Sequence, residues 1–206
     1  MFLKPDDHVL FYGDSITDVG RSPDGTSHLG GGYAFLCAAF LGARFSEMNL
    51  RWSNTGISGN RVGDLEERLQ TDVLDRKPNL VSILIGINDT WRSFDSGEKS
   101  PVADFQNSYR RIAGAIQESG ARLMILEPFL LPIPDDRRAW REDLDPRIFA
   151  CREIAREFGA HYLPLDGIFA AAACRQSLAY WAPDGVHPSA AGHALIAQNW
   201  IDAVTS

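Results

Sequence analysis

A chain of 206 residues is long enough for one domain with a sizeable core, because folding at this length buries roughly 70% of the unfolded surface. The composition, 45% hydrophobic and 23% charged, is that of a globular protein and excludes a disordered chain. The net charge of -7 argues against a general attraction to nucleic acid or to an anionic membrane. We therefore expect neither as a partner, and a small molecule as the substrate.

The amino terminus lacks a basic region followed by an apolar stretch, and no run reaches the ~18 apolar residues of a membrane span. These features predict a soluble, cytoplasmic protein. Cys37, Cys151 and Cys174 lie far apart and have none of the close spacings of metal sites. We interpret all three as small buried hydrophobic residues.

The first element is an apolar run at residues 9–12 that stops at Gly13 and is followed by Asp14 and Ser15. Strands of parallel sheets are buried on both faces and show no alternation, so a short apolar run is consistent with one. A serine at the carboxyl end of such a strand sits where α/β proteins bind ligands. Taken alone, however, Gly-Asp-Ser is more often a simple turn.

The remaining elements alternate along the chain. Apolar runs predict further strands at residues 48–53, 80–85, 123–126 and 161–165. Helices are predicted at residues 33–45, 62–73, 101–120, 148–158, 168–175 and 189–204. The signals are apolar residues at helical spacing, proline or serine at helix starts and glycine at a helix end. Residues 127–146, rich in Pro, Arg and Asp, fit no element and are expected to form a long loop.

Five strands that alternate with helices predict a single α/β domain over residues 1–206, with a parallel sheet and right-handed crossovers. The ordinary solution at this size is a flavodoxin-like three-layer α/β/α sandwich with a five-stranded parallel sheet. Strand order itself cannot be obtained from the sequence.

Three strand-to-helix junctions carry small and polar residues: 13–15, 56–60 and 86–89. In a parallel sheet all three lie at the same edge. A fourth cluster places Asp184 three residues before His187, ahead of the last helix. This spacing lets the carboxylate bind the δ-nitrogen of the imidazole and leaves the ε-nitrogen free to take a proton.

These clusters contain every group that nucleophilic serine chemistry needs. Ser15 is the candidate nucleophile, His187 the general base and acid, and Asp184 the group that orients the base. The backbone N–H groups of Ser15 and Gly59 and the side-chain amide of Asn88 are candidate donors for the oxyanion.

In order, these blocks resemble the motifs of the SGNH (GDSL) hydrolases, and the resemblance spans residues 9 to about 200. The matching positions are Gly13-Asp14-Ser15, Gly59 within Ile-Ser-Gly-Asn, Gly86-x-Asn88-Asp89 and Asp184-x-x-His187-Pro188. The resemblance implies a flavodoxin-like fold, esterase or lipase-type acyl hydrolysis without a cofactor, and the roles just given to the five candidate residues.

Within that family the motifs look like those of the intracellular bacterial carbohydrate acetylesterases that act on xylo-oligosaccharides. This narrower resemblance implies an acetylated sugar as substrate and a homo-oligomer. Trp91 and Trp181 each follow a junction with candidate residues and could form aromatic walls of the substrate pocket, or could equally pack under loops.

Other interpretations are less favoured. A metal site built from Asp14, Asp18, Asp89 and His187 lacks the set of converging oxygens that hard cations need, so we expect no metal. A thioesterase or lysophospholipase needs a long acyl pocket, which residues 127–146 would have to supply despite their charge. A non-catalytic carbohydrate-binding protein on the same fold does not explain why every candidate catalytic position is filled.

Overall fold

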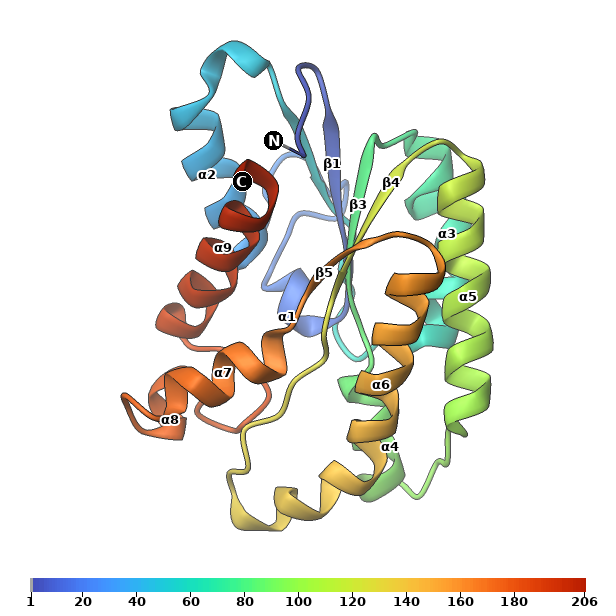
Figure 1. The fold of residues 1–206 in the computed structure, drawn as a ribbon, viewed down its shortest axis with the longest axis vertical. Helices are drawn as coiled ribbons and strands as arrows, with labels where there is room; N and C mark the ends of the chain where they lie inside the picture. Colours follow the sequence, from blue (N-terminus) through green and yellow to red (C-terminus); the bar gives the residue numbers. More distant parts are fainter. Residues whose placement is uncertain (1) are drawn as a thin grey trace.

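A five-stranded, all-parallel sheet forms the centre of the computed structural model, which describes residues 2–206 (Figure 1). The strands are β1 (His8–Gly13), β2 (Arg51–Asn54), β3 (Leu80–Leu84), β4 (Arg122–Leu126) and β5 (His161–Leu163). Their order is β2-β1-β3-β4-β5, which is the flavodoxin-like order. The predicted α/β class and parallel sheet are therefore confirmed.

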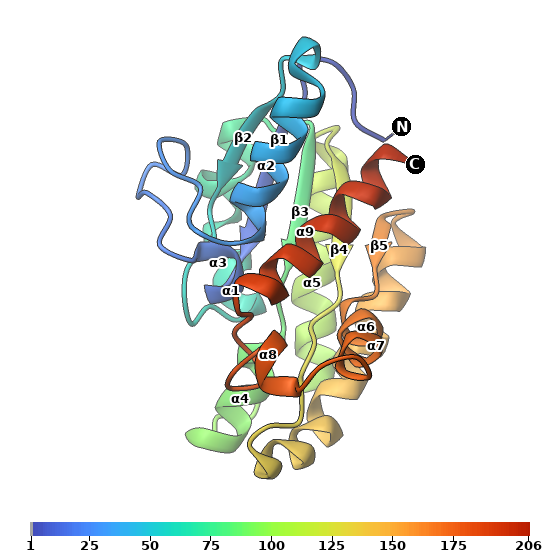
Figure 2. The same cartoon turned by 90° about the vertical axis from the view of Figure 1, so that its left-hand side faces the viewer.

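Helices cover both faces of the sheet and make the three layers (Figures 1 and 2). One face carries α2 (Tyr33–Arg44), α7 (Leu165–Ala173) and α9 (Ala190–Thr205). The other carries α3 (Val62–Asp72), α5 (Val102–Glu118) and α6 (Arg141–Glu157). Shorter segments are the helices α1 (Ser15–Asp18), α4 (Ile87–Asp95) and α8 (Leu178–Trp181), and the 3-10 turns η1 (Ser46–Met48), η2 (Leu74–Arg76) and η3 (Asp135–Trp140).

Successive residues of a strand point to opposite faces, so each strand contributes to two cores. In β1, Val9 and Phe11 pack in the layer with α2 and α9, while Leu10 and Tyr12 pack in the layer with α3 and α5. Every residue of β1 is buried, which is why the strand shows no polar alternation. Burying one such side chain stabilises the fold by about 1.5–3 kcal/mol.

Two predicted segments differ in the structure. The strand expected at residues 48–53 begins only at Arg51, because residues 46–48 form η1 and Asn49 has a left-handed backbone (φ 52°) that ends the turn. The loop expected at 127–146 is irregular only over residues 127–134; the rest is η3 and the start of α6, with Pro146 inside the helix.

Further differences concern caps, a junction and one thiol. Ser189 caps α9 by accepting the N–H of Gly192 at 3.2 Å, as expected of a serine cap, but α5 begins after Pro101 and has no side-chain cap, although Ser100 precedes this proline. The polar junction after β3 continues directly into α4, a helix for which no prediction was made. Cys37 and Cys151 are buried, whereas Cys174 is exposed and was wrongly predicted to be buried.

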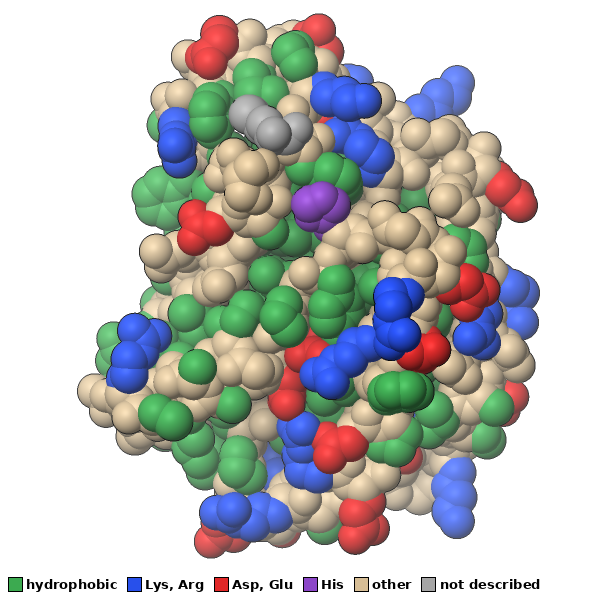
Figure 3. Space-filling model, viewed as in Figure 1, with side chains coloured by type: hydrophobic (Ala, Val, Ile, Leu, Met, Phe, Trp, Pro, Cys, Tyr) green, Lys and Arg blue, Asp and Glu red, His purple; other side chains and the backbone are tan. Residues whose placement is uncertain are grey.

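The surface mixes charges of both signs. Lys and Arg side chains lie beside Asp and Glu side chains over the α6 side of the molecule, with apolar side chains between them (Figure 3). Ion pairs such as Arg141–Asp166 and Arg110–Glu157, both at 2.7 Å, join charges of opposite sign at the surface. Among residues 2–206, none of the helices combines the length and the apolar character that crossing a membrane requires.

Candidate active site

Ser15 lies at the end of β1, where the chain turns sharply into α1. Gly13 makes this turn possible, because a Cβ there would clash with Thr17 Oγ1 and with a backbone carbonyl of β3. The carboxylate of Asp14 then caps α1 by accepting the N–H of Ile16 at 3.0 Å. Together these contacts hold the Ser15 hydroxyl at the carboxyl edge of the sheet.

The structure joins the three predicted catalytic side chains in one hydrogen-bonded chain. Ser15 Oγ lies 3.0 Å from His187 Nε2, and His187 Nδ1 lies 2.7 Å from Asp184 Oδ2. The other oxygen of Asp184 accepts the backbone N–H groups of Val186 (3.0 Å) and His187 (2.8 Å), which fixes the loop. An Nδ1 proton donated to the carboxylate leaves Nε2 free to accept the serine proton.

The electrostatics of this hydrogen-bonded triad favour a negatively charged Asp184 beside a positively charged His187. Partial burial alone would raise the pKa of Asp184, but hydrogen bonds from the side chain and backbone of His187 hold that pKa below its usual range. The bond to Asp184 in turn raises the pKa of His187, against the opposing effects of burial and of the Arg137 charge. His187 becomes an imidazolium when it takes a proton as general base, and Asp184 stabilises this charged form.

The three candidate oxyanion donors come from the ends of three neighbouring strands. Gly59 lies in the exposed loop after β2 with φ +84°, a backbone that suits glycine. Asn88 is the second residue of α4, only 6% exposed, and one N–H of its amide donates to the Asn60 carbonyl at 3.0 Å. The second N–H of this amide remains for a ligand, while the loop itself is tied to Gly13 by the N–H of Ile57 at 3.0 Å.

Arg68 is a bracing residue that the sequence analysis missed. Its guanidinium donates to the Gly13 carbonyl (3.0 Å), the Thr55 carbonyl (2.6 Å) and Asn60 Oδ1 (2.7 Å). One side chain on α3 therefore ties the ends of β1 and β2 to the loop with Gly59. No motif marks it, because its position on α3 resembles that of any polar helix residue.

Asn54, the last residue of β2, is a second bracing residue without a predicted role. Its side-chain NH₂ group donates to the Thr17 carbonyl at 2.6 Å and to the Leu29 carbonyl at 2.8 Å. Its side-chain oxygen accepts the N–H of Gly56 at 2.9 Å. It lies between the strand predicted at residues 48–53 and the polar junction at 56–60, and this position is the signal that could have identified it.

The two tryptophans have different surroundings. The ring of Trp91, on α4, lies 5.9 Å from the ring of His187, centroid to centroid. Trp181 instead donates its indole N–H to the Ala172 carbonyl at 3.1 Å and accepts the Ser189 N–H at its own carbonyl, so it joins α8 to α7 and α9. Trp91 therefore lies beside the triad, whereas Trp181 packs between helices.

The carboxylates of Asp18 and Asp89 accept hydrogen bonds that hold the loops near the site in place. Asp18 accepts the N–H and the hydroxyl of Ser58, and Asp89 accepts the N–H of Val62 at 3.2 Å. In residues 2–206, no three His, Cys, Asp or Glu side chains gather as they would around a metal ion. Three arginines near these junctions also bond within the chain: Arg21 to the Gly56 carbonyl (2.6 Å), Arg61 to Glu98 (2.9 Å) and Arg92 to Asp95 (2.7 Å).

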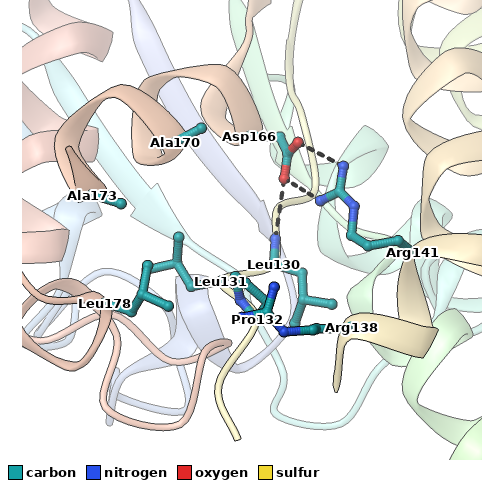
Figure 4. A pocket seen from close by; sticks show the side chains of 9 residues that line it. All are labelled: Leu130, Leu131, Pro132, Arg138, Arg141, Asp166, Ala170, Ala173 and Leu178. Atoms are coloured by element: carbon teal, nitrogen blue, oxygen red, sulfur yellow. Dashed lines mark hydrogen bonds and ion pairs between the residues drawn. The ribbon is translucent and has the colours of Figure 1, made fainter. Parts of the chain in front are cut away.

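A cavity of about 460 Å³ lies between α7, α8 and the segment that follows β4 (Figure 4). Leu130, Leu131 and Leu178 supply apolar walls, and Arg141 forms two hydrogen bonds to Asp166 at its edge. None of the predicted site residues lines this cavity. The N–H of Leu131 in the cavity wall donates to the Gly185 carbonyl at 2.9 Å, which links the wall to the loop that carries Asp184.

The model of the GDSL-like Lipase/Acylhydrolase family matches residues 11–195, which span every element from β1 to α9. The chain belongs to this family. It is therefore a carboxylic ester hydrolase of the GDSL, or SGNH, type.

Relatives are similar to this protein in sequence and in structure along nearly the whole chain. An acetylxylan esterase from Geobacillus stearothermophilus is 34% identical over 209 residues, covering 98% of this chain and 95% of that protein. The crystal structure of Axe2, an acetylxylan esterase from the same organism, superposes with a TM-score of 0.92 at 30% identity over 100% of this chain and 97% of its own. LAE5, an α/β hydrolase from the metagenome of Lake Arreo, gives a TM-score of 0.93 at 32% identity, covering 100% and 98%.

Proposed function

We propose that this protein is a serine esterase that removes acetyl groups from a carbohydrate, such as an acetylated xylo-oligosaccharide. The observation that carries the proposal is the hydrogen-bonded chain Ser15–His187–Asp184 at the carboxyl edge of the sheet. The similarity to acetylxylan esterases over nearly the whole chain supports the acetyl group and the sugar.

The reaction proceeds in two half-reactions. In the first, His187 Nε2 takes the proton of Ser15 as Oγ attacks the ester carbonyl, and it then gives this proton to the leaving sugar oxygen. In the second, water loses a proton to the same nitrogen as it attacks the acetyl-serine, and the imidazolium then returns this proton to Ser15 Oγ as acetate leaves. Asp184 holds the imidazole in the required tautomer and stabilises the imidazolium in both steps.

A negative charge develops on the carbonyl oxygen in each half-reaction. The N–H groups of Ser15 and Gly59 and the free amide N–H of Asn88 are proposed to receive it. The bracing bonds of Arg68 and Asn54 keep the strand ends and the loop in place before the substrate arrives, so little reorganisation is needed when the charge forms.

The length of the acyl group tests the assignment to acetyl. A longer chain needs an apolar channel that begins at the serine, and the cavity in Figure 4 has charged residues at its edge and none of the predicted site residues in its walls. Among p-nitrophenyl esters from acetyl to dodecanoyl, we expect kcat/KM to be highest for acetyl and to fall at least tenfold by octanoyl. A maximum at eight or more carbons would favour the lysophospholipase or thioesterase alternative.

The pH dependence follows from the charge on His187. Its pKa is raised from the ordinary 6.5 by the bond to Asp184, and only the neutral imidazole can accept the serine proton. We therefore expect kcat/KM for p-nitrophenyl acetate to rise with pH through an inflection above 6.5. An inflection clearly below that value would contradict the assignment.

Asp14 provides the control for this profile. Burial raises the pKa of its carboxyl to about 7, so it titrates in the same range, and its charge also raises the pKa of His187. In Asp14→Asn the side-chain oxygen can still cap α1. We expect the inflection to remain in this variant and to move to lower pH; its disappearance would assign it to Asp14 instead.

A further inference from the structure

Arg137 is a buried cation beside the candidate active site without a partner for its charge. It lies in η3, the segment between β4 and α6 at the lower end of the molecule in Figure 1, and is only 9% exposed. Its Nη1 is fully buried and, within residues 2–206, meets no hydrogen-bond acceptor, and no carboxylate of that part of the chain forms an ion pair with it. Neither the mechanism nor the family motifs give this side chain a role.

Two indole rings hold the guanidinium in place. Its central carbon lies 4.4 Å from the ring centroid of Trp91 and 4.6 Å from that of Trp140, and Phe94 stacks on Trp140 at 5.6 Å. Cation–π contacts stabilise the faces of the guanidinium but leave its N–H groups, which point outward in its plane, unsatisfied. The cation is therefore oriented without being neutralised.

The location of this cation ties it to the candidate site. Trp91, which contacts the guanidinium, also lies 5.9 Å from the ring of His187. The positive charge of Arg137 is close enough to His187 to lower the pKa of that imidazole. A group bound by Arg137 would thus lie next to the leaving-group side or the acyl side of the reacting ester.

The other buried arginine of residues 2–206, Arg147, has a counter-charge, although its Nη1 also lacks a hydrogen-bond partner. Arg147 has a fully buried side chain and donates from Nε to Asp143 at 2.9 Å, and the partly buried Arg68 pairs with Asp72 at 2.6 Å. Desolvating a charge is costly unless a counter-charge and hydrogen bonds repay it. Arg137 departs from this pattern, which points to a ligand that brings the missing negative charge.

We propose that Arg137 is a specificity-determining residue that binds a carboxylate on the sugar portion of the substrate, so that the preferred substrate is an acetylated carbohydrate carrying a uronic acid. The planar fork of N–H donors matches the two oxygens of a carboxylate. Neutral sugar hydroxyls could satisfy the N–H groups but not the charge. This inference rests on the proposed function, because it takes the substrate to be an acetylated carbohydrate.

The test compares three variants on three substrates. The variants are Arg137→Gln, Arg137→Lys, which keeps the charge and most of the stem, and Arg138→Gln, a control at the adjacent position, where the side chain is 67% exposed. The substrates are two acetylated xylo-oligosaccharides of equal length, one with and one without a glucuronic acid, and p-nitrophenyl acetate.

We expect the unaltered enzyme to prefer the acidic oligosaccharide at least tenfold in kcat/KM. Arg137→Gln should lose tenfold to a hundredfold on that substrate, mainly through a higher KM, and change less than threefold on the other two. Arg137→Lys should keep part of the preference, and Arg138→Gln all of it. An equal loss of kcat/KM on all three substrates in Arg137→Gln would show that Arg137 only supports the packing of Trp91 and Trp140. If the unaltered enzyme did not prefer the acidic oligosaccharide, the proposal would be overturned directly.

A binding measurement separates this inference from the proposed function. Methyl glucuronoside and methyl xyloside are titrated calorimetrically into the unaltered protein and into Arg137→Gln. We expect only the glucuronoside to bind, and only to the unaltered protein. No binding would overturn the role of Arg137 even if the protein deacetylates sugars, whereas binding without any deacetylation would leave the carboxylate site standing and overturn the proposed reaction.

Discussion

Replacing Ser15 with alanine is expected to abolish hydrolysis of p-nitrophenyl acetate, with a loss on the order of 10⁶-fold in kcat, as for the nucleophile of other serine hydrolases. The Ser15 hydroxyl has His187 Nε2 as its hydrogen-bond partner at 3.0 Å, so its removal breaks no other side-chain hydrogen bond within residues 2–206. Its backbone N–H stays in the oxyanion site. The measurements are steady-state kinetics and labelling by a fluorophosphonate, which should also disappear.

Because only one oxygen atom is removed, substrate binding should survive in Ser15→Ala. Calorimetric titration with an acetylated xylo-oligosaccharide should give a Kd within about threefold of the KM of the active enzyme, provided that chemistry is slow relative to dissociation. Ser22→Ala, which alters a hydroxyl in an exposed loop, is the matched control and should keep full activity. Retained turnover in Ser15→Ala would refute a serine mechanism at this position.

The sequence predicted the sheet well where each strand is a buried apolar run. Every residue of β1 and of β3 is buried, so runs composed mainly of apolar residues mark these strands. The start of β2 was misplaced because Met48 is apolar and buried yet belongs to η1. Local hydrophobicity cannot distinguish a buried turn from a buried strand, and here a left-handed residue at Asn49 makes the difference.

The start of α6 was missed because its sequence carries signals against a helix. Pro146 lacks the N–H that a helix interior uses, and the surrounding residues are charged rather than amphipathic. Two ion pairs stabilise this part of α6 despite the proline. Arg147 pairs with Asp143 one turn away, and Arg141 pairs with Asp166 on α7. A contact to a residue 25 positions away is a property of the fold and has no local sequence signal.

The candidate site was predictable to the extent that its residues follow strand ends. Parallel strands present their carboxyl ends at one edge, which is why Ser15, Gly59 and Asn88 could be grouped from chain order alone. Bracing and binding groups that reach this edge from elsewhere could not be found that way. Arg68 comes from the middle of α3 and Arg137 from η3, and only the folded chain brings them there.

Replacing Asn88 with alanine is expected to lower kcat by about 10²–10³-fold, or about 2.7–4 kcal/mol of transition-state stabilisation, with little change in KM. The amide has two N–H groups: one is used by the Asn60 carbonyl at 3.0 Å, and the other is proposed to meet the oxyanion. The negative charge on that oxygen appears only as the tetrahedral state forms. Loss of the donor therefore affects the reaction more than the binding of the ground state.

The variant also cuts the tie between α4 and the loop that holds Gly59, so a control must loosen the same loop without removing a donor. Ser58→Ala serves, because it removes only the hydroxyl that donates to Asp18 at 2.8 Å. If loop mobility caused the loss, Ser58→Ala would share much of it and both variants would raise KM. If Asn88 stabilises the oxyanion, kcat falls in Asn88→Ala alone, and an unchanged kcat there would remove Asn88 from the oxyanion site.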